Sequence, residues 1–124
     1  MLTFGKHLRL LNASDYKPVF DQADFRVSHP NLLFLARANT TGYPRLGIVV
    51  AKRNARKATE RNRIKRLIRE SFRLRQHQLP HLDVIVLARR DLDTLNNATI
   101  SKILKKQWQR LSNKSKATPN TGKS

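Results

Sequence analysis

The chain has 124 residues, no cysteine, and 26 Lys and Arg against 8 Asp and Glu, which gives a formal net charge of +18. This length fits one domain with a modest core, and the absence of cysteine excludes a disulfide framework and a thiolate metal site. No apolar run approaches the roughly 20 residues of a membrane-spanning helix, and the N-terminus lacks the apolar segment of a secretory signal. The composition predicts a cytoplasmic protein with no membrane partner and with a polyanion, RNA or DNA, as its ligand.

The first part of the chain predicts one helix followed by three strands. Ser14 and Asp15 are candidate caps of a helix that runs to about Ala23. The strands are expected at residues 25–27, 31–38 and 45–52, although the continuous apolar run of the second also suits a helix. Turn residues fill the segment 39–44, which predicts an antiparallel hairpin of the second and third strands.

A basic helix is predicted from Ala58 to about Arg75 or Gln78. Its apolar side recurs at helical spacing and consists of Ile64, Leu67, Ile68, Ser71 and Phe72. The opposite side carries cations and one amide: Asn62, Lys65, Arg66, Arg69 and Arg73. Arg61 falls between the two sides, and Arg63 falls on the far flank. Solvated helices usually mix both signs of charge, so this cationic side predicts contact with phosphate rather than an idle basic surface.

The last part of the chain predicts a strand at Asp83–Ala88, buried on both faces, and a final helix capped by Asp91, Asp93 or Thr94. The apolar stripe of this helix is Ile100, Ile103, Leu104, Trp108 and Leu111. From Ser112 the polar composition predicts a disordered basic tail. The chain is therefore expected to form one domain at residues 1–111, followed by a tail at residues 112–124.

The resulting order, α-β-β-β-α-β-α, predicts an α+β sandwich with a four-stranded mixed sheet. The succession of strand, basic helix and strand implies a crossover between two parallel strands. In the first helix, Tyr16 and Phe20 share one side at i, i+4. Two alternatives are open for this pair: the rings pack in the core, or they line a groove in which bases stack.

No catalytic site is visible among the chain's own side chains. The eight acids are scattered, and Asp91 and Asp93, which could approach one metal ion, are better explained as residues that start a helix. The four histidines lack metal-ligand spacing, and no nucleophile motif or phosphate-binding glycine loop occurs. The sequence predicts neither catalytic nor metal-binding residues in this chain.

The basic helix carries a motif that resembles the signature of the protein subunit of bacterial ribonuclease P: Ala58-x-x-Arg61-Asn62-Arg63-Ile64-Lys65-Arg66-Leu67-Ile68-Arg69. The similarity extends over nearly the whole chain. It includes Arg9-Leu10, Tyr16, Val19-Phe20, Arg45-x-Gly47, Lys52-Arg53, Ala88-Arg89 and the final helix with its aromatic residue.

This resemblance implies a left-handed β-α-β crossover, against the usual handedness. It also implies a division of labour, in which the RNA subunit binds Mg²⁺ and cleaves precursor tRNA while the protein binds that RNA and the 5′ leader of the substrate. No cofactor bound by the protein alone and no obligate protein partner are expected. The expected RNA-binding residues are Lys52, Arg53, Arg61, Asn62, Arg63, Lys65, Arg66, Arg69 and Arg73, and the expected residues of the leader cleft are Tyr16, Phe20 and Phe34.

Three functions remain as hypotheses. The first is the protein subunit of ribonuclease P, an endoribonuclease ribonucleoprotein that matures the 5′ end of tRNA. The second is a structural RNA-binding protein, such as a ribosomal protein, which would share the charge but have no effect on cleavage. The third is a nuclease that acts alone, which the scattered acids disfavour.

Overall fold

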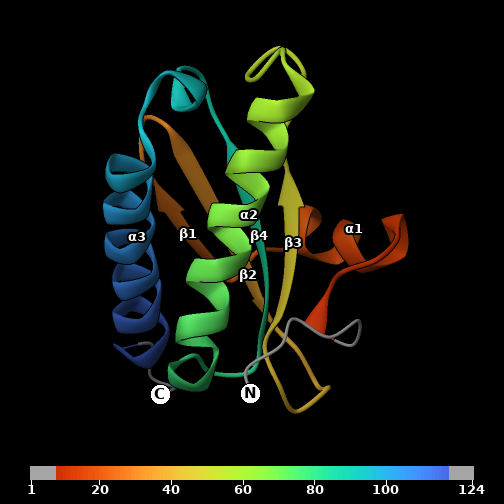
Figure 1. The fold of residues 1–124 in the computed structure, drawn as a ribbon. Helices are drawn as coiled ribbons and strands as arrows, with labels where there is room; N and C mark the ends of the chain where they lie inside the picture. The colour runs from red at the N-terminus through yellow and green to blue at the C-terminus, as the bar shows by residue number, and fades with distance from the viewer. Residues whose placement is uncertain (1–7, 118–124) are drawn as a thin grey trace.

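The computed structural model describes residues 8–117, in which helices and strands follow the predicted α-β-β-β-α-β-α order (Figure 1). The elements are α1 (Ala13–Asp21), β1 (Phe25–Ser28), β2 (Leu32–Ala38), β3 (Arg45–Val49), α2 (Ala58–Arg75), β4 (Leu82–Ala88) and α3 (Asn97–Ala117). Two short 3₁₀ helices, η2 (Gln76–Gln78) and η3 (Leu92–Thr94), flank β4. No helix within residues 8–117 has the length and apolar character needed to cross a membrane.

The four strands form one mixed sheet in the order β1-β2-β4-β3. Strand β2 is antiparallel to β1 and to β4, whereas β3 is parallel to β4. The predicted hairpin of the second and third strands is therefore wrong, because β4 lies between them. The apolar run of β4 is buried on both faces, which suits the central position. The hairpin that does form joins β1 and β2.

The β3-α2-β4 crossover is left-handed, as the family resemblance implied. With α2 in front of the sheet and both parallel strands pointing upward, β4 lies to the left of β3 (Figure 1). The crossover places the whole of α2 on the same face of the sheet as α3, so that α2 lies between α3 and the edge strand β3.

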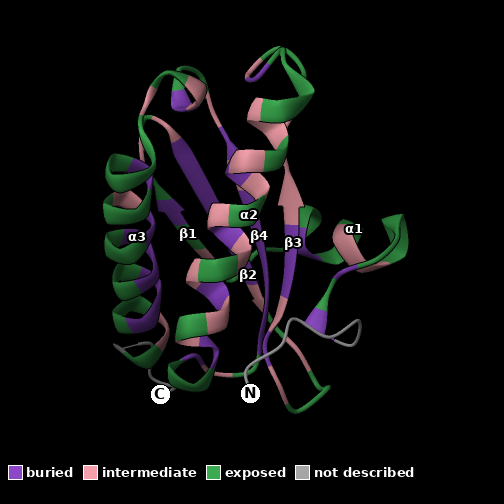
Figure 2. Ribbon diagram, viewed as in Figure 1, coloured by how far each residue is buried: buried purple, intermediate pink, exposed green. Residues whose placement is uncertain are grey.

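The sheet separates two apolar clusters. In Figure 2 the middle strands β2 and β4 are mostly buried, whereas α3 is exposed along the side that faces away from the sheet. Alternate residues of β2 divide between the two clusters, since side chains along a strand point to opposite faces. Leu32, Phe34 and Ala36 belong to the larger cluster under α2 and α3, while Leu33 and Leu35 belong to the smaller cluster under α1. The fold therefore has three layers, with α1 alone on one side of the sheet.

The predicted caps of the first and last helices are corrected by the structure. Asn12 caps α1: its side chain accepts a hydrogen bond from the Asp15 backbone N–H at 3.1 Å, and Asp15 closes the capping box from the third helical position. At α3 the capping side chain is Asn96, which accepts from the Thr99 N–H at 2.8 Å. Of the three predicted caps, Asp91 directly precedes η3, and Asp93 and Thr94 lie within η3.

Helix α3 also continues six residues past its predicted end at Leu111. Ser112 is buried, and the Lys114 ammonium donates to the Arg26 carbonyl oxygen of β1 at 2.8 Å. The polar segment thus remains helical because it packs along the edge of the sheet, so the predicted disordered tail is wrong for residues 112–117. The remaining residues of that predicted tail, 118–124, lie outside the described residues.

Candidate nucleic-acid interface

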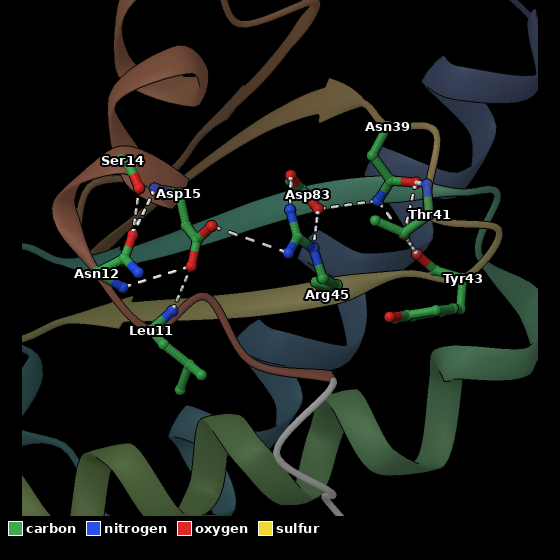
Figure 3. A network of polar contacts seen from close by, with 9 residues as sticks. All are labelled: Leu11, Asn12, Ser14, Asp15, Asn39, Thr41, Tyr43, Arg45 and Asp83. Atoms are coloured by element: carbon green, nitrogen blue, oxygen red, sulfur yellow. Dashed lines mark hydrogen bonds and ion pairs between the residues drawn. The ribbon is translucent and has the colours of Figure 1, made fainter.

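A polar network holds α1 against the edge of the sheet (Figure 3). The Arg45 guanidinium of β3 donates twice to the Asp83 carboxylate of β4, at 2.8 and 2.7 Å, and lies 3.9 Å from an Asp15 oxygen in α1. The hydrogen bond to Asp83 raises the pKa of Arg45, and Asn39 donates to the same carboxylate at 2.8 Å. The network connects β3, β4 and the start of α1, which fixes where the aromatic residues of α1 lie.

Tyr16 packs directly on β3. Its hydroxyl oxygen accepts a hydrogen bond from the Ile48 N–H at 3.2 Å, and a Cβ placed on Gly47 would lie 2.8 Å from the Tyr16 ring. Phe20 stacks on Tyr16 with ring centroids 6.4 Å apart and an interplanar angle of 21°. The two alternatives left open by the sequence are not exclusive for Tyr16, which is half-buried on β3 and also lines a groove between α1, β3 and α2. Phe20 is 46% exposed and stacks on Tyr16, but it is not among the residues that line this groove.

A groove of about 700 Å³ runs between α1, β3 and α2. Tyr16 lies on one side, Leu46 and Ile48 of β3 contribute apolar surface, and α2 supplies the other side. The α2 residues are Lys65, Arg66, Arg69, Glu70 and Arg73. Four of the residues predicted on the cationic side of the basic helix therefore line one groove together with one predicted aromatic residue.

These four cations, Lys65, Arg66, Arg69 and Arg73, have no hydrogen-bonding or ion-pair partner within residues 8–117, although Glu70 lines the same groove. Like charges one helical turn apart repel one another, so the arrangement is destabilising until an anion enters the groove. The groove thus combines cations with an aromatic ring, the two kinds of group that bind single-stranded nucleic acid.

Two arginines of the predicted RNA-binding set are engaged within the protein. Arg61 donates to the carbonyl oxygens of Ala55 and Arg56 at 2.9 and 2.8 Å, which holds the segment that leads into α2. Arg63 bonds to Glu60 at 2.8 Å and to Asn97 of α3 at 2.6 Å. Arg63 therefore joins α2 to α3 with its charge balanced, outside the groove. Its predicted contact with RNA has no support in this geometry.

The remaining predicted cations lie near the start of α2. Lys52, Arg53 and Asn62 are exposed. Arg53 also borders a hollow of about 510 Å³ that Arg56, Lys57 and residues of η3 help to line. This hollow and the groove share no lining residue, although both lie along α2.

Phe34 is misassigned to the cleft. Its side chain is 0% exposed and packs edge-on against Trp108 of α3, with ring centroids 4.6 Å apart and an interplanar angle of 70°. It faces the helix-covered side of the sheet, opposite to Tyr16. The sequence could not reveal this, because Leu32–Ala36 is apolar at every position and so gives no alternation from which to read the faces.

Arg9 is a groove residue to which sequence reasoning gave no function. It pairs with Leu46 of β3 in an isolated parallel bridge and lines the groove beside Tyr16. In the sequence, Arg9-Leu10 stands out only as part of the family resemblance. Among residues 8–117, no three His, Asp or Glu side chains come together in a way that could hold a metal ion.

The family model for ribonuclease P matches residues 4–112 of the chain. The chain belongs to the ribonuclease P protein family. It is 55% identical over 108 residues to the ribonuclease P protein component of Chromohalobacter salexigens, an alignment that covers 87% of this chain and 84% of the relative. With the protein component of Escherichia coli the identity is 50% over 109 residues, covering 88% and 91% of the two chains.

Solved structures of the same family share the fold. The ribonuclease P protein of Staphylococcus aureus superposes with a TM-score of 0.78 at 26% identity, covering 83% of this chain and 94% of that chain. The protein of Thermotoga maritima gives a TM-score of 0.67 at 31% identity, covering 79% and 96%. The α+β sandwich is therefore an architecture of this family, and the chain is a protein component of an endoribonuclease complex.

Proposed function

We propose that the chain binds the catalytic RNA of ribonuclease P and holds the 5′ leader of precursor tRNA in the groove between α1, β3 and α2. The observation that carries this proposal is the set of four cations, Lys65, Arg66, Arg69 and Arg73, that have no partner among the described residues and face Tyr16 across the groove. Phosphates of a single strand would lie along the cations, and unstacked bases would contact the aromatic residues of α1.

The chemistry of the groove suits a ligand of variable sequence. Arg and Lys attract phosphate regardless of the base it carries. Stacking on an aromatic ring contributes about 1–3 kcal/mol per base and tolerates every base. A protein that serves many precursor tRNAs needs this tolerance, because their leaders differ.

The exposed residues near the start of α2 are suited to the catalytic RNA. Lys52 and Arg53 lie just before the segment that Arg61 holds through its bonds to the Ala55 and Arg56 carbonyl oxygens, and Asn62 lies in the first two turns of α2. A preformed segment loses less conformational freedom on binding. In this arrangement α2 presents one surface to each RNA, with the catalytic RNA at its start and the leader along its middle.

The hydrolysis itself is proposed to belong to the RNA subunit with its Mg²⁺, and the protein is proposed to act in the cytoplasm, where tRNA is processed. The protein would raise the affinity for substrate and reduce the Mg²⁺ that the ribozyme needs, since its cations neutralise phosphate repulsion between the two RNAs.

Reconstitution tests the proposal. The purified chain is mixed with ribonuclease P RNA of its organism and a precursor tRNA with a leader, at a Mg²⁺ concentration too low for the RNA alone. Cleavage at the mature 5′ end that depends on the protein is expected. If the protein binds both RNAs but leaves cleavage unchanged, the alternative of a purely structural RNA-binding protein is correct instead. Cleavage without the RNA subunit would place a catalytic site in this chain.

A further inference from the structure

Helix α3 presents a second cationic surface. Four exposed cations recur every fourth residue along the helix, and the last two of them bond to backbone carbonyl oxygens of the edge strand β1: Lys102, Lys106, Arg110 and Lys114. Successive members are about 6 Å apart along the helix axis, from the rise of about 1.5 Å per residue. Between Asn97 and Ala117 the helix has no Asp or Glu, so the row is not balanced by acids on its own helix.

Two guanidinium groups, one in this row and one beside it, are fixed in place by uncharged acceptors. Arg110 donates to the Ser28 carbonyl oxygen at 3.0 Å and to the Gln107 amide oxygen at 2.8 Å. Arg89 donates to the Ser28 hydroxyl at 3.1 Å and to the His29 carbonyl oxygen at 3.0 Å. All four acceptors are uncharged, and each bonded guanidinium uses a single nitrogen, Nη1. The remaining N–H groups are available to an anion, and their orientation is already set.

Burial and these cations lower the pKa of His29, which lies in the turn between β1 and β2. Burial has the largest effect, and the charges of Arg110, Lys106 and Arg89 lower the pKa further. Three cations from α3 and from the end of β4 therefore act on one site. A shallow hollow of about 400 Å³ adjoins them, lined by Val27, Arg110, Asn113 and Lys114.

This surface is distinct from the groove. The groove lies on the α1 side of α2, whereas α3 lies on the other side of α2 (Figure 1). No residue lines both the groove and the hollow beside Arg110. An RNA strand seated in the groove would therefore leave the α3 row uncovered.

The chemistry of the row selects its ligand. The aromatic residue of α3, Trp108, is 1% exposed, so the helix itself offers no ring on which bases could stack. The large hydrophobic residues exposed within residues 8–117 are Leu11, Phe20 and Leu74, none of which belongs to α3. The row thus lacks the apolar side chains with which an interfacial helix enters a membrane. What remains is a ladder of cations suited to a phosphate backbone.

We propose that the α3 surface, formed by Lys102, Lys106, Arg110, Lys114 and Arg89, binds the phosphate backbone of a folded RNA segment other than the strand in the groove. This inference depends on the proposed function in one respect, namely that the polyanion bound by the protein is RNA. With one RNA segment on each side of α2, the protein bridges two parts of a ribonucleoprotein.

The test variant combines Lys102→Gln with Lys106→Gln. These two side chains form no hydrogen bond or ion pair with the described residues, and Arg110 and Arg89 are left in place. Two probes are used at a series of salt concentrations: ribonuclease P RNA and a short single-stranded RNA. For ribonuclease P RNA, the slope of log affinity against log salt is expected to fall by up to about 1.8, from about 0.9 per lost contact. The slope for the short RNA is expected to stay unchanged.

Two controls separate a local effect from a general loss of charge. Lys102→Arg with Lys106→Arg keeps the charge and is expected to retain wild-type binding. Lys17→Gln on α1 with Ala23→Glu in the segment after α1 lowers the net charge by the same two units and is expected to keep the wild-type slope for ribonuclease P RNA. The affinity of the wild type for the short RNA tests the groove alone. A groove that does not bind RNA would therefore be recognised independently of the result for the α3 surface.

Three results would overturn the proposal: an unchanged slope for ribonuclease P RNA in the Lys102→Gln, Lys106→Gln variant, an equal loss of slope with both probes, or an equal loss in the α1 control. A loss of binding to anionic lipid vesicles with undiminished binding to RNA would also overturn it, since the ligand would then be a membrane surface.

Discussion

Tyr16 lies so close to Gly47 that a Cβ at residue 47 would be 2.8 Å from its ring carbons Cε2 and Cζ. The glycine is therefore required for a close approach of α1 to β3 and not for an unusual backbone angle. Its lack of a side chain allows the Tyr16 hydroxyl to reach the Ile48 N–H. One side of the groove depends on this contact between two residues.

Gly47→Ala is expected to displace the Tyr16 ring, because the added methyl group and the ring cannot occupy the same space. Overpacking of this kind costs about 1–3 kcal/mol of the free energy of unfolding, measurable by urea denaturation. In a Tyr16→Ala background the same substitution should cost much less. Equal costs in the two backgrounds would show that the ring does not determine the need for glycine.

Phe20 lies outside the groove lining but stacks on Tyr16, which belongs to it. A base that continues from Tyr16 onto the exposed Phe20 ring would contribute about 1–3 kcal/mol, so Phe20→Ala is expected to weaken binding of a short single-stranded RNA by up to that amount. The side chain is 46% exposed, so the variant should lose only about 1 kcal/mol of stability, roughly half the transfer free energy of a fully buried ring. Fluorescence anisotropy with labelled RNA measures the first quantity, and urea denaturation measures the second.

Phe34→Ala provides the contrast. Its ring is enclosed by the sheet and by Trp108, and the cavity left behind should cost about 3–5 kcal/mol of stability. Where the variant is still folded, its affinity for the short RNA should match the wild type. A large loss of RNA affinity with little loss of stability would restore Phe34 to the cleft.

Arg66→Gln and Arg63→Gln form a matched pair on the same helix. Arg66 lines the groove with no partner among the described residues, and its loss should reduce the slope of log affinity against log salt by about 0.7–0.9, the value for one phosphate contact. Arg63 is balanced by Glu60 and bonded to Asn97, so its loss should lower stability and leave the slope unchanged. Salt titrations of both variants check this, and identical slopes in both would contradict the assignment.

The stability of the fold should depend on pH through His29. Its pKa is lowered in the folded state by burial and by nearby cations, so the unfolded chain binds the proton more tightly. The stability that neutral His29 contributes to the fold is fully present above the ordinary histidine pKa of about 6.5. This stability is lost as the pH falls through the lowered pKa of the folded state. The Asn31 N–H, which donates to His29 Nδ1 at 3.0 Å, favours the same neutral form.

The measurement is the free energy of unfolding of the wild type and of His29→Gln between about pH 7.5 and about pH 5, the range in which this histidine titrates. The wild type should lose more stability than the variant as the pH falls. A stability difference that stays constant over this range would show that His29 does not titrate differently in the two states.

The sequence was sufficient for features that depend on local pattern. Helical spacing placed Ile64, Ile68 and Phe72 in the core and put Lys65 and Arg69 on the side that borders the groove. The order of elements and the parallel pairing of β3 with β4 also followed from the chain. These features were predictable because each is specified within a few turns of one element or by the order of neighbouring elements.

Features that depend on distant contacts were not predictable. The insertion of β4 between β2 and β3 requires knowledge of which strands pair. The burial of Phe34 depends on which face of the apolar strand β2 lies under α2 and α3 and which lies under α1. Residues 112–117 remain helical only because Lys114 and the buried Ser112 meet the sheet edge, and left-handedness came from family resemblance alone.

The central claim is that the groove holds the 5′ leader, and the most direct measurement is the ratio of two affinities. The complex of this protein with ribonuclease P RNA is titrated with precursor tRNA that carries or lacks a leader. We expect the wild type to bind the leader-bearing form more tightly, and Arg69→Gln with Arg73→Gln to bring the ratio close to one while affinity for the leaderless form is kept. An unchanged ratio in that variant, or an equal loss of affinity for both substrates, would contradict the claim.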